Sequence, residues 1–402
     1  MNNHIFQGMD LTDVRVTSRI LGTIRGKNKG PLYFFFAGIH GNEKAGIIAL
    51  QELFQELETH KESIKGTLHA ILGNRSAFFE NTRFIDIDLN RIWTEDRIAY
   101  VKDSNRNALN IEELEMLDLI YLINHEIQDK KTPVYFIDFH TTSSKSIPFI
   151  TINDALINRK LAMKFPVPVI LGIEEFLEGP MLSYINSKGF VALGFEAGQH
   201  NDPKSIENTL SFIYLTLSFT GAFIQHDPKK HFYHFNRLAV RSSHLNKAFE
   251  IVHHHPLGSN DSFQMLPGFE SFQTIKKGET LAMLNGHQFH SPISGRILMP
   301  LYQKLGNDAF FIIHRIPEWA LKLSSFLRKY KLYSLLRILP GIQKDENNKK
   351  VLIADLNITK YLAKSIFHLF GYRIQKSDDQ NVRLYNRERT SKKNIYRKTP
   401  WW

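Results

Sequence analysis

The sequence predicts an α/β fold: a mixed, mainly parallel sheet with helices on both faces, followed by a small all-β domain and a basic C-terminal extension. Three observations support this prediction. Strand-length apolar runs alternate with helix-like stretches in the first half, turn residues crowd the following part, and positive charge collects near the end. A chain of 402 residues is too long for one compact core of ordinary size. We place the domains at residues 1–235, 236–316 and 317–402.

The first domain is predicted from its alternating pattern. Its apolar runs have the length of strands, and each is followed by Gly, Asn or a polar turn. The runs are 32–36, 68–72, 134–137, 167–171 and 190–195. Residues 43–57 and 111–127 carry apolar side chains at helical spacing. This alternation is typical of a mainly parallel sheet that helices cover on both faces.

The composition excludes several kinds of site. The chain has no cysteines, which excludes disulfides, thiolate metal sites and cysteine nucleophiles and fits a reducing cytoplasm. The first residues do not read as a signal peptide, because no basic region precedes an apolar stretch. Residues 208–225 are the longest uncharged stretch, but their Asn, Ser, Thr and Gly residues favour a buried helix. We therefore expect a cytoplasmic protein with no membrane span.

Turn signals divide residues 236–316 into short β-like pieces. They include Lys-Lys-Gly-Glu at 276–279, Asn-Gly at 285–286 and Ser-Pro-Ile-Ser-Gly at 291–295. No helix of useful length is expected there, and the pattern predicts a small β-sandwich or barrel.

The positive charge of the chain belongs to residues 315–402. They carry 20 Lys and Arg against 7 Asp and Glu, a net charge of +13, so the first 314 residues sum to −2. We expect helices at 319–339 and 358–370, a strand at 351–355 and loose order over 391–402. Such a segment could bind nucleic acid or an anionic surface, but a solvated extension is the simpler interpretation, and we expect no nucleic-acid partner.

The ends of two predicted strands carry residues that could hold a metal ion. His40 and Glu43 follow the first strand and open a helix, and glycines on either side of His40 let the backbone turn sharply. His140 follows the third strand. Because ligands bind at the carboxyl ends of parallel strands, these side chains are expected to meet. Two histidines and a glutamate are a standard open zinc site, with one Zn²⁺ per chain and water in the fourth position.

Further residues match the other needs of a metal hydrolase. Asp138, two residues before His140, could fix the tautomer of that histidine. Glu196 ends the strand at 190–195 and could take a proton from zinc-activated water and pass it to a leaving amine. Residues 83–91 contain two arginines and an asparagine, and a guanidinium can neutralise an oxyanion or clamp a carboxylate.

Together these segments resemble the succinylglutamate desuccinylase/aspartoacylase family of the zinc carboxypeptidase-like superfamily. The resemblance is carried by GIHGNE at 38–43, GN at 73–74, NTRFIDIDLNR at 81–91, DFHTT at 138–142 and GFEAG at 194–198. It covers about residues 1–235. It extends more weakly into the β domain through SPISGRILMP at 291–300 and GNDAFFI at 306–312. It implies a zinc-dependent hydrolase that cleaves the amide bond of an N-acyl amino acid or a related carboxylate-bearing small molecule.

The resemblance also implies roles for individual residues. The implied zinc ligands are His40, Glu43 and His140. Glu196 would be the general base, and Arg83 would polarise the scissile carbonyl. Asn90 and Arg91 would hold the carboxylate of the substrate, and Tyr302 in the β domain would contact the substrate.

One departure from the family pattern concerns specificity. Members that act on acidic substrates carry a further arginine shortly before the base glutamate, whereas residues 186–195 offer only Lys188. Specificity for aspartate or succinylglutamate is therefore not implied. A zinc carboxypeptidase-type peptidase and a deacylase or esterase acting on a larger anionic substrate remain open. A non-enzymatic binding module is the weakest alternative, and the sequence leaves homo-oligomerisation open.

Several other residues could have a functional role. Consecutive histidines at 253–255 alternate too tightly for one ion, which favours a structural role. His200 could line the pocket or be an ordinary loop residue, and His287 and His290 are taken as structural. The tryptophans at 401–402 could dock on the body of the protein, on a partner, or be disordered.

Overall fold

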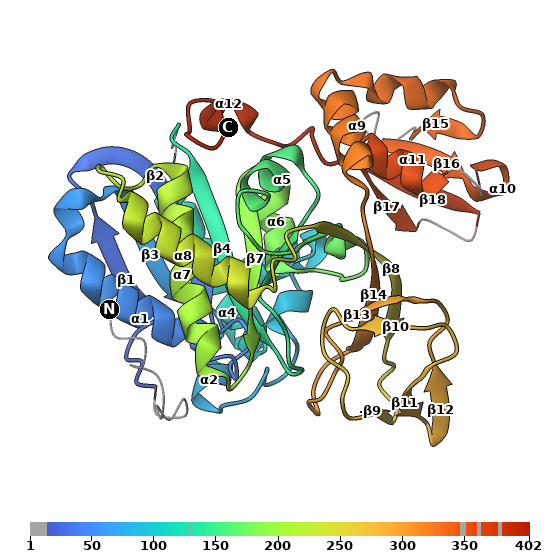
Figure 1. Cartoon of the computed structure of the whole chain (residues 1–402), viewed down its shortest axis with the longest axis horizontal. Helices are drawn as coiled ribbons and strands as arrows, with labels where there is room; N and C mark the ends of the chain where they lie inside the picture. The colour runs from blue at the N-terminus through green and yellow to red at the C-terminus, as the bar shows by residue number, and fades with distance from the viewer. Residues whose placement is uncertain (1–13, 129–130, 346–350, 360–362, 377–379) are drawn as a thin grey trace.

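The computed structural model describes residues 14–128, 131–345, 351–359, 363–376 and 380–402. One eleven-stranded sheet runs through the molecule in the order β1-β3-β2-β4-β7-β5-β6-β8-β14-β13-β10 (Figure 1). The strands in the first domain are β1 (Ile20–Arg25), β2 (Asn28–Ala37), β3 (Lys65–Leu72), β4 (Val134–Thr142), β5 (Phe149–Ile152), β6 (Val169–Leu171) and β7 (Val191–Gln199).

The pairing in this first part is mostly parallel. β3, β2, β4 and β7 run parallel to one another, as do β5 and β6. Edge strand β1 is antiparallel to β3, and β5 is antiparallel to β7. The predicted mixed, mainly parallel sheet is confirmed.

Helices cover both faces of the sheet because the strands are apolar on both sides. In β2, Tyr33 and Phe35 enter the core on one face, whereas Phe34 and Phe36 enter the core on the other. The first face is covered by α1 (Ala45–Thr59), α5 (Leu156–Ala162), α7 (Pro203–Thr220) and α8 (Pro228–Arg241). The second is covered by α3 (Glu95–Asp103), α4 (Ile111–Ile127) and α6 (Met181–Ser187). The short α2 (Arg75–Phe79) lies against α4.

The uncharged stretch at 208–225 is largely the buried helix α7, as predicted. Most of its side chains are buried against the sheet and α1. Within the described ranges, no helix is both long and apolar enough to cross a bilayer.

The second part of the chain is rich in β-structure, as expected, but it is not a separate sheet. Its strands are β8 (Ala248–Pro256), β9 (Phe263–Met265), β10 (Thr274–Ile275), β11 (Thr280–Leu284), β12 (His287–His290), β13 (Gly295–Leu298) and β14 (Asp308–Arg315). β8 pairs in parallel with β6, so the main sheet continues through β8, β14, β13 and β10. β9, β11 and β12 form a small sheet of their own. The boundary placed at 235 falls inside α8, because buried Leu238 keeps this helix on the main core as far as Arg241.

The basic C-terminal part is folded around a third sheet. This four-stranded antiparallel sheet has the order β15-β16-β18-β17. Its strands are β15 (Ile342–Lys344), β16 (Val351–Asp355), β17 (Tyr372–Lys376) and β18 (Asn381–Asn386). The helix expected at 319–339 is two helices, α9 (Glu318–Lys329) and the 3₁₀ helix η5 (Leu332–Ile338), separated at Lys331, whose φ is 55°. The helix expected at 358–370 overlaps α10 (Leu356–Thr359) and α11 (Ala363–Leu369), and residues 360–362 lie outside the described residues.

The prediction that residues 391–402 are loosely ordered is wrong. After β18 the chain returns to the first domain, where α12 (Lys393–Tyr396) lies against it (Figure 1). Tyr396 is fully buried, donates a hydrogen bond to the carbonyl of Val134 and accepts one from the amide of Val191. The indole of Trp401 donates to the hydroxyl of Tyr135 at 2.9 Å. The polar composition of this segment concealed two aromatic side chains that the core of the first domain requires.

Candidate active site

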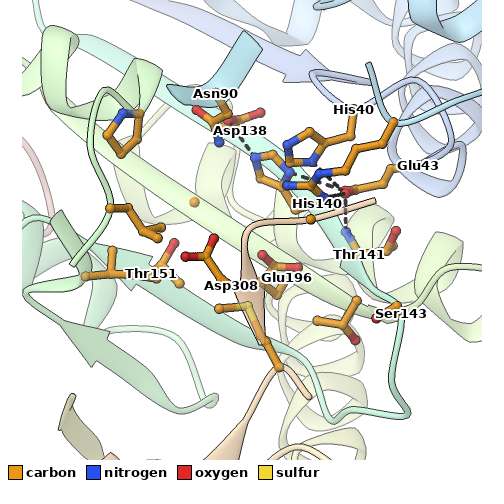
Figure 2. Close-up of a pocket in the computed structure, with 18 of the residues that line it drawn as sticks. His40, Glu43, Asn90, Asp138, His140, Thr141, Ser143, Thr151, Glu196 and Asp308 are labelled. Carbon is orange, nitrogen blue, oxygen red and sulfur yellow. Dashed lines mark hydrogen bonds and ion pairs between the residues drawn. The ribbon is translucent and has the colours of Figure 1, made fainter. Parts of the chain in front are cut away.

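The turn after β2 places His40 and Glu43 at the carboxyl end of the sheet. Gly38 has a φ of 68°, which an L-residue rarely adopts, and it ends the strand there. At Gly41, a Cβ would lie 2.1 Å from the carbonyl carbon of Ala77, so no larger residue fits. The sharp turn lets both side chains face the cavity (Figure 2).

His40, Glu43 and His140 meet as predicted, and we refer to these three candidate ligands as the metal cluster. Their potential ligand atoms lie within 4.8 Å of one another. Nδ1 of His40 lies 2.7 Å from Oε1 of Glu43, and Nδ1 of His140 lies 3.2 Å from its Oε2. The amide of Thr141 also donates to Oε2, at 2.8 Å. Two imidazole nitrogens and a carboxylate directed at one point fit the donor set of an open zinc site.

Two further carboxylates hold the outer nitrogens of these histidines. Oδ2 of Asp138 lies 2.7 Å from Nε2 of His140, and Oδ1 of Asp88 lies 3.2 Å from Nε2 of His40. An acceptor at Nε2 favours the tautomer that leaves Nδ1 free to bind a metal. The contact expected of Asp138 is therefore present. Sequence reasoning missed Asp88, although it lies in the same motif as Arg83 and Asn90.

Charge pairing shifts the pKa values of Glu43 and His140 in opposite directions. Burial alone would raise the pKa of the Glu43 carboxyl, but His40 and His140 hold that pKa well below its usual range. Burial opposes protonation of His140, but Asp138 and Glu43 raise the pKa of its imidazole well above the usual value. Glu43 is therefore an anion at neutral pH and is suited to bind a cation.

Arg83 is oriented by Asp88. Its Nε and one terminal nitrogen donate to Oδ2 of Asp88 at 3.1 and 2.9 Å. The other terminal nitrogen lies 3.8 Å from Oε1 of Glu43 and faces the cavity. This bidentate pair leaves one edge of the guanidinium beside the metal cluster, where it could bind an oxyanion.

Glu196 lies across the cavity from the cluster. It is the register partner of His140 in the parallel pair β4–β7, so both side chains emerge at the same level. Its Oε2 atom is buried and has no hydrogen-bond partner among the described residues. Burial raises the pKa of this carboxyl to about 8; His140 opposes the shift, and the negative charges of Glu43 and Asp138 add to it. A buried carboxylate without a partner is a strong proton acceptor.

Asn90 and Arg91 line the same cavity, but each already has a protein partner. Oδ1 of Asn90 accepts a hydrogen bond from the amide of Met181. Arg91 donates to Oδ2 of Asp308 at 2.6 Å, and Oδ1 of Asp308 lies 2.8 Å from Nε2 of His254. Figure 2 shows the Asp308 carboxylate directed into the cavity between Glu196 and Asn90. The predicted carboxylate-binding arginine is thus paired with a carboxylate of the protein itself.

The cavity lining also contains a set of apolar side chains. The cavity has a volume of about 140 Å³. The apolar side chains in its lining are Ile152, Ile173, Leu177, Pro180, Leu182, Met299, Leu301 and Phe311. They come from β5, from the segment between β6 and α6, from α6 and from the β domain. This wall suits an uncharged, apolar part of a ligand.

The remaining predicted residues divide into two groups. His200 lines the cavity, with Nδ1 2.7 Å from the Thr141 hydroxyl and Nε2 3.2 Å from Oε1 of Gln303. Tyr302 is not part of the lining; its hydroxyl donates to the carbonyl of Leu266 and accepts from the amide of Phe269. Sequence reasoning did not anticipate Gln303, which follows Tyr302 directly and does reach the cavity.

The histidines at 253–255 belong to the packing and hydrogen bonding of the β domain. His253 and His255 stack near the ring of Phe310, and His254 bonds Asp308. Within the described part of the chain, they do not join a group of metal-binding side chains.

Comparison with known proteins places part of the chain in a family. Residues 29–198 match the family model of the succinylglutamate desuccinylase/aspartoacylase catalytic domain, a segment that contains every member of the metal cluster and Glu196. This segment belongs to that family. No curated protein matches the chain in sequence.

Solved structures of the family share the fold at low sequence identity. A succinylglutamate desuccinylase/aspartoacylase from Rhodobacter sphaeroides has a TM-score of 0.54 and 14% identity, covering 74% of this chain and 88% of that one. The product-bound ectoine utilization protein from Ruegeria pomeroyi has a TM-score of 0.50 and 17% identity, covering 72% of this chain and 87% of that one. The desuccinylase/aspartoacylase fold is therefore shared well beyond the segment that the family model matches.

Proposed function

We propose that this chain is a zinc-dependent hydrolase that cleaves the amide bond of an N-acyl amino acid or a related carboxylate-bearing amide. The observation that carries the proposal is the convergence of His40, Glu43 and His140 opposite an unpartnered oxygen of Glu196. Membership of the 29–198 segment in a family of amide hydrolases supports it independently.

His40, Glu43 and His140 would hold the metal. A zinc ion bound there would supply a Lewis acid and would lower the pKa of water to about 7. Asp88 and Asp138 keep the outer nitrogens of the histidines engaged, so that their Nδ1 atoms stay directed at Glu43.

Glu196 would move the protons of the reaction. Its buried carboxylate would accept a proton from the attacking water and deliver it to the nitrogen of the leaving amine. The terminal nitrogen of Arg83 that faces the cavity would stabilise the negative charge that develops on the carbonyl oxygen. Strand β7 positions Glu196, and the Asp88 carboxylate positions Arg83, so both side chains are in place before a substrate binds.

The rest of the cavity would position the substrate. Asn90 and Arg91 would bind its carboxylate, which would have to exchange with Asp308 for the guanidinium. The apolar wall that includes Leu177, Leu182 and Phe311 would hold an apolar acyl group or side chain. We therefore propose substrates with an apolar part, unlike succinylglutamate, which carries acidic groups on both its acyl and its amino-acid side.

The test is a screen of N-acyl amino acids with apolar and acidic groups against zinc-loaded protein, read out as released free amine.

Glu196→Gln is expected to lower turnover by roughly 10²–10⁴-fold while bound zinc stays near the wild-type value. Glu178→Gln, at an exposed carboxylate beside the cavity wall, is the matched control and should keep full turnover. Near-wild-type turnover in Glu196→Gln would rule out its role as the base.

A further inference from the structure

Helix α9 presents a row of large apolar side chains to solvent. The row consists of Trp319, Leu323, Phe326 and Tyr330, which recur at i, i+4, i+7 and i+11 and so lie on one face of the helix. Trp319 is 66% exposed and Phe326 is 54% exposed. Isolated exposed apolar residues are common on proteins, but a continuous row along one helix indicates an interaction surface.

The opposite face of α9 is turned toward the protein, where Leu321 packs against the core of the first domain and two polar side chains are buried. Ser324 donates to the carbonyl of Leu369 at 2.9 Å, and fully buried Arg328 donates to a carboxylate oxygen of Asp154 at 2.6 Å. Buried polar contacts thus hold the inner face together with Leu321, while the largest apolar side chains of the helix face solvent. Because buried polar contacts fix the inner face, the apolar row is held outward.

The apolar row continues into η5. Leu335, Ile338 and Leu339 are exposed there, with Ile338 at 77%, whereas Leu336 enters the core of the C-terminal domain. We call the exposed apolar side chains of these two helices the α9–η5 surface. Its members are Trp319, Leu323, Phe326, Tyr330, Leu335, Ile338 and Leu339.

Positive charges border the α9–η5 surface. They are the exposed residues Lys322, Lys329, Lys331 and Arg337. In the described part of the chain, no carboxylate forms a close ion pair with these four groups; Glu318, at the start of the helix, is paired with Lys247 and also attracts Lys322. An anionic partner is therefore favoured, and a second copy of the same surface is disfavoured because it would bring like charges together.

We propose that the α9–η5 surface docks this protein on an anionic phospholipid bilayer. A helix with Trp, Phe and Leu on one face and Lys beside them is suited to lie in the interface, with the rings among the acyl chains and the ammonium groups at the phosphates. Lysines near an anionic leaflet add electrostatic attraction that salt screens. Nucleic acid is less suitable, because Leu323, Leu335 and Ile338 offer it neither charge nor a ring for stacking.

Vesicle flotation of the full chain tests the proposal. The protein is expected to float with vesicles of phosphatidylcholine containing about 30% phosphatidylserine, and not with phosphatidylcholine alone. Raising the salt concentration should weaken the binding. Absence of binding to both kinds of vesicle, or equal binding to both, would overturn the proposal.

Matched variants tie the binding to this surface. The double variant Trp319→Ser and Phe326→Ser should lose vesicle binding by about 10-fold or more. Phe79→Ser is the control, because Phe79 on α2 is 55% exposed, almost the same as Phe326. Lys322→Glu with Lys329→Glu should also weaken binding, whereas Lys102→Glu on α3 should not.

Two alternative results have distinct signatures. Sedimentation that shows a dimer lost in the Phe326→Ser variant, without vesicle binding by the parent, would assign the surface to self-association. Binding of an RNA oligonucleotide without vesicle binding would assign it to nucleic acid. Either result overturns the proposal, and neither bears on hydrolysis at the cavity.

Discussion

The two sides of the active-site cavity differ in chemistry and in how they are supported. The metal side is polar, and its ligands are held by Asp88 and Asp138 from the same domain. The apolar wall comes from the first domain and the β domain, and the C-terminal part supports it from behind. Ile173 of this wall immediately precedes Glu174 and Glu175, and both of these glutamates are bound by Arg387 of the C-terminal part. The proposed reaction chemistry thus uses residues of one domain, whereas the proposed substrate-recognition wall depends on contacts with the other two parts.

Removing a ligand on the metal side should have the largest effect. His40→Ala deletes one of the three donors, and we expect zinc affinity to fall by more than about 100-fold, beyond the loss typical of an outer partner. Metal content after dialysis, measured by elemental analysis, tests this. His200→Ala is the control, since His200 lines the same cavity outside the cluster, and zinc loss in both variants would contradict the assignment.

The support of the apolar wall should depend on pH. Burial disfavours the Glu175 carboxylate, but a hydrogen bond with His368 and the charge of Arg387 lower its pKa to about 2. Because this value lies below the unfolded value, the stabilisation is fully present above about pH 4.5 and is lost as the pH falls toward 2. The Glu175 carboxylate thus contributes about 3 kcal/mol to the free energy of unfolding at neutral pH.

Denaturant unfolding at several pH values measures this contribution. The free energy of unfolding of Glu175→Gln should change less than that of the parent between about pH 4.5 and 2, and it should be lower than the parent at neutral pH. Parallel curves for the two proteins would show that the carboxylate does not support the wall in this way.

A smaller change should follow from trimming the wall itself. Leu182→Ala removes apolar contact from α6 without touching the metal cluster, so kcat/KM for an apolar N-acyl amino acid should fall by about 10-fold. Bound zinc should stay unchanged. Leu182→Met, which keeps the volume, is the control. A matching loss in both variants would point to a disturbed α6 and not to lost contact with the substrate.

The smallest effect is expected where the two sides meet. Asp308→Asn keeps the acceptor for His254 but removes the charge that competes for Arg91, so KM for a carboxylate-bearing substrate should fall by about 3- to 10-fold. Steady-state kinetics with acids and the matching amides test this. An increase in KM would mean that Asp308 itself binds the substrate.

The metal side could be predicted from the sequence because its geometry follows from local rules. His40, Glu43, His140 and Glu196 each end or follow an apolar strand, and parallel strands bring their carboxyl ends to one edge. The helix at 111–127 and the strand at 351–355 were found at their observed bounds, since each is a regular apolar pattern.

The other side could not be predicted, because it depends on contacts between distant segments. Asp308 meets Arg91 only because β14 is joined to the main sheet through β8 and β6. No local sequence pattern indicates that pairing. For the same reason, the β domain was expected to be separate. The order of residues 391–402 was missed for the same reason. Trp401 is buried through its contact with Tyr135, which lies 266 positions earlier in the chain.

The return of the chain to the first domain also bears on the order of synthesis. The hydroxyl of Tyr396 links the backbones of Val134 and Val191, on two adjacent strands that carry the proposed site residues His140 and Glu196 toward their far ends. A ribosome that has translated all of 29–198 has therefore not yet supplied every side chain of that core. The first domain can begin to fold early but becomes complete only when Tyr396 emerges, so assembly of its sheet is coupled to synthesis of the parts that follow.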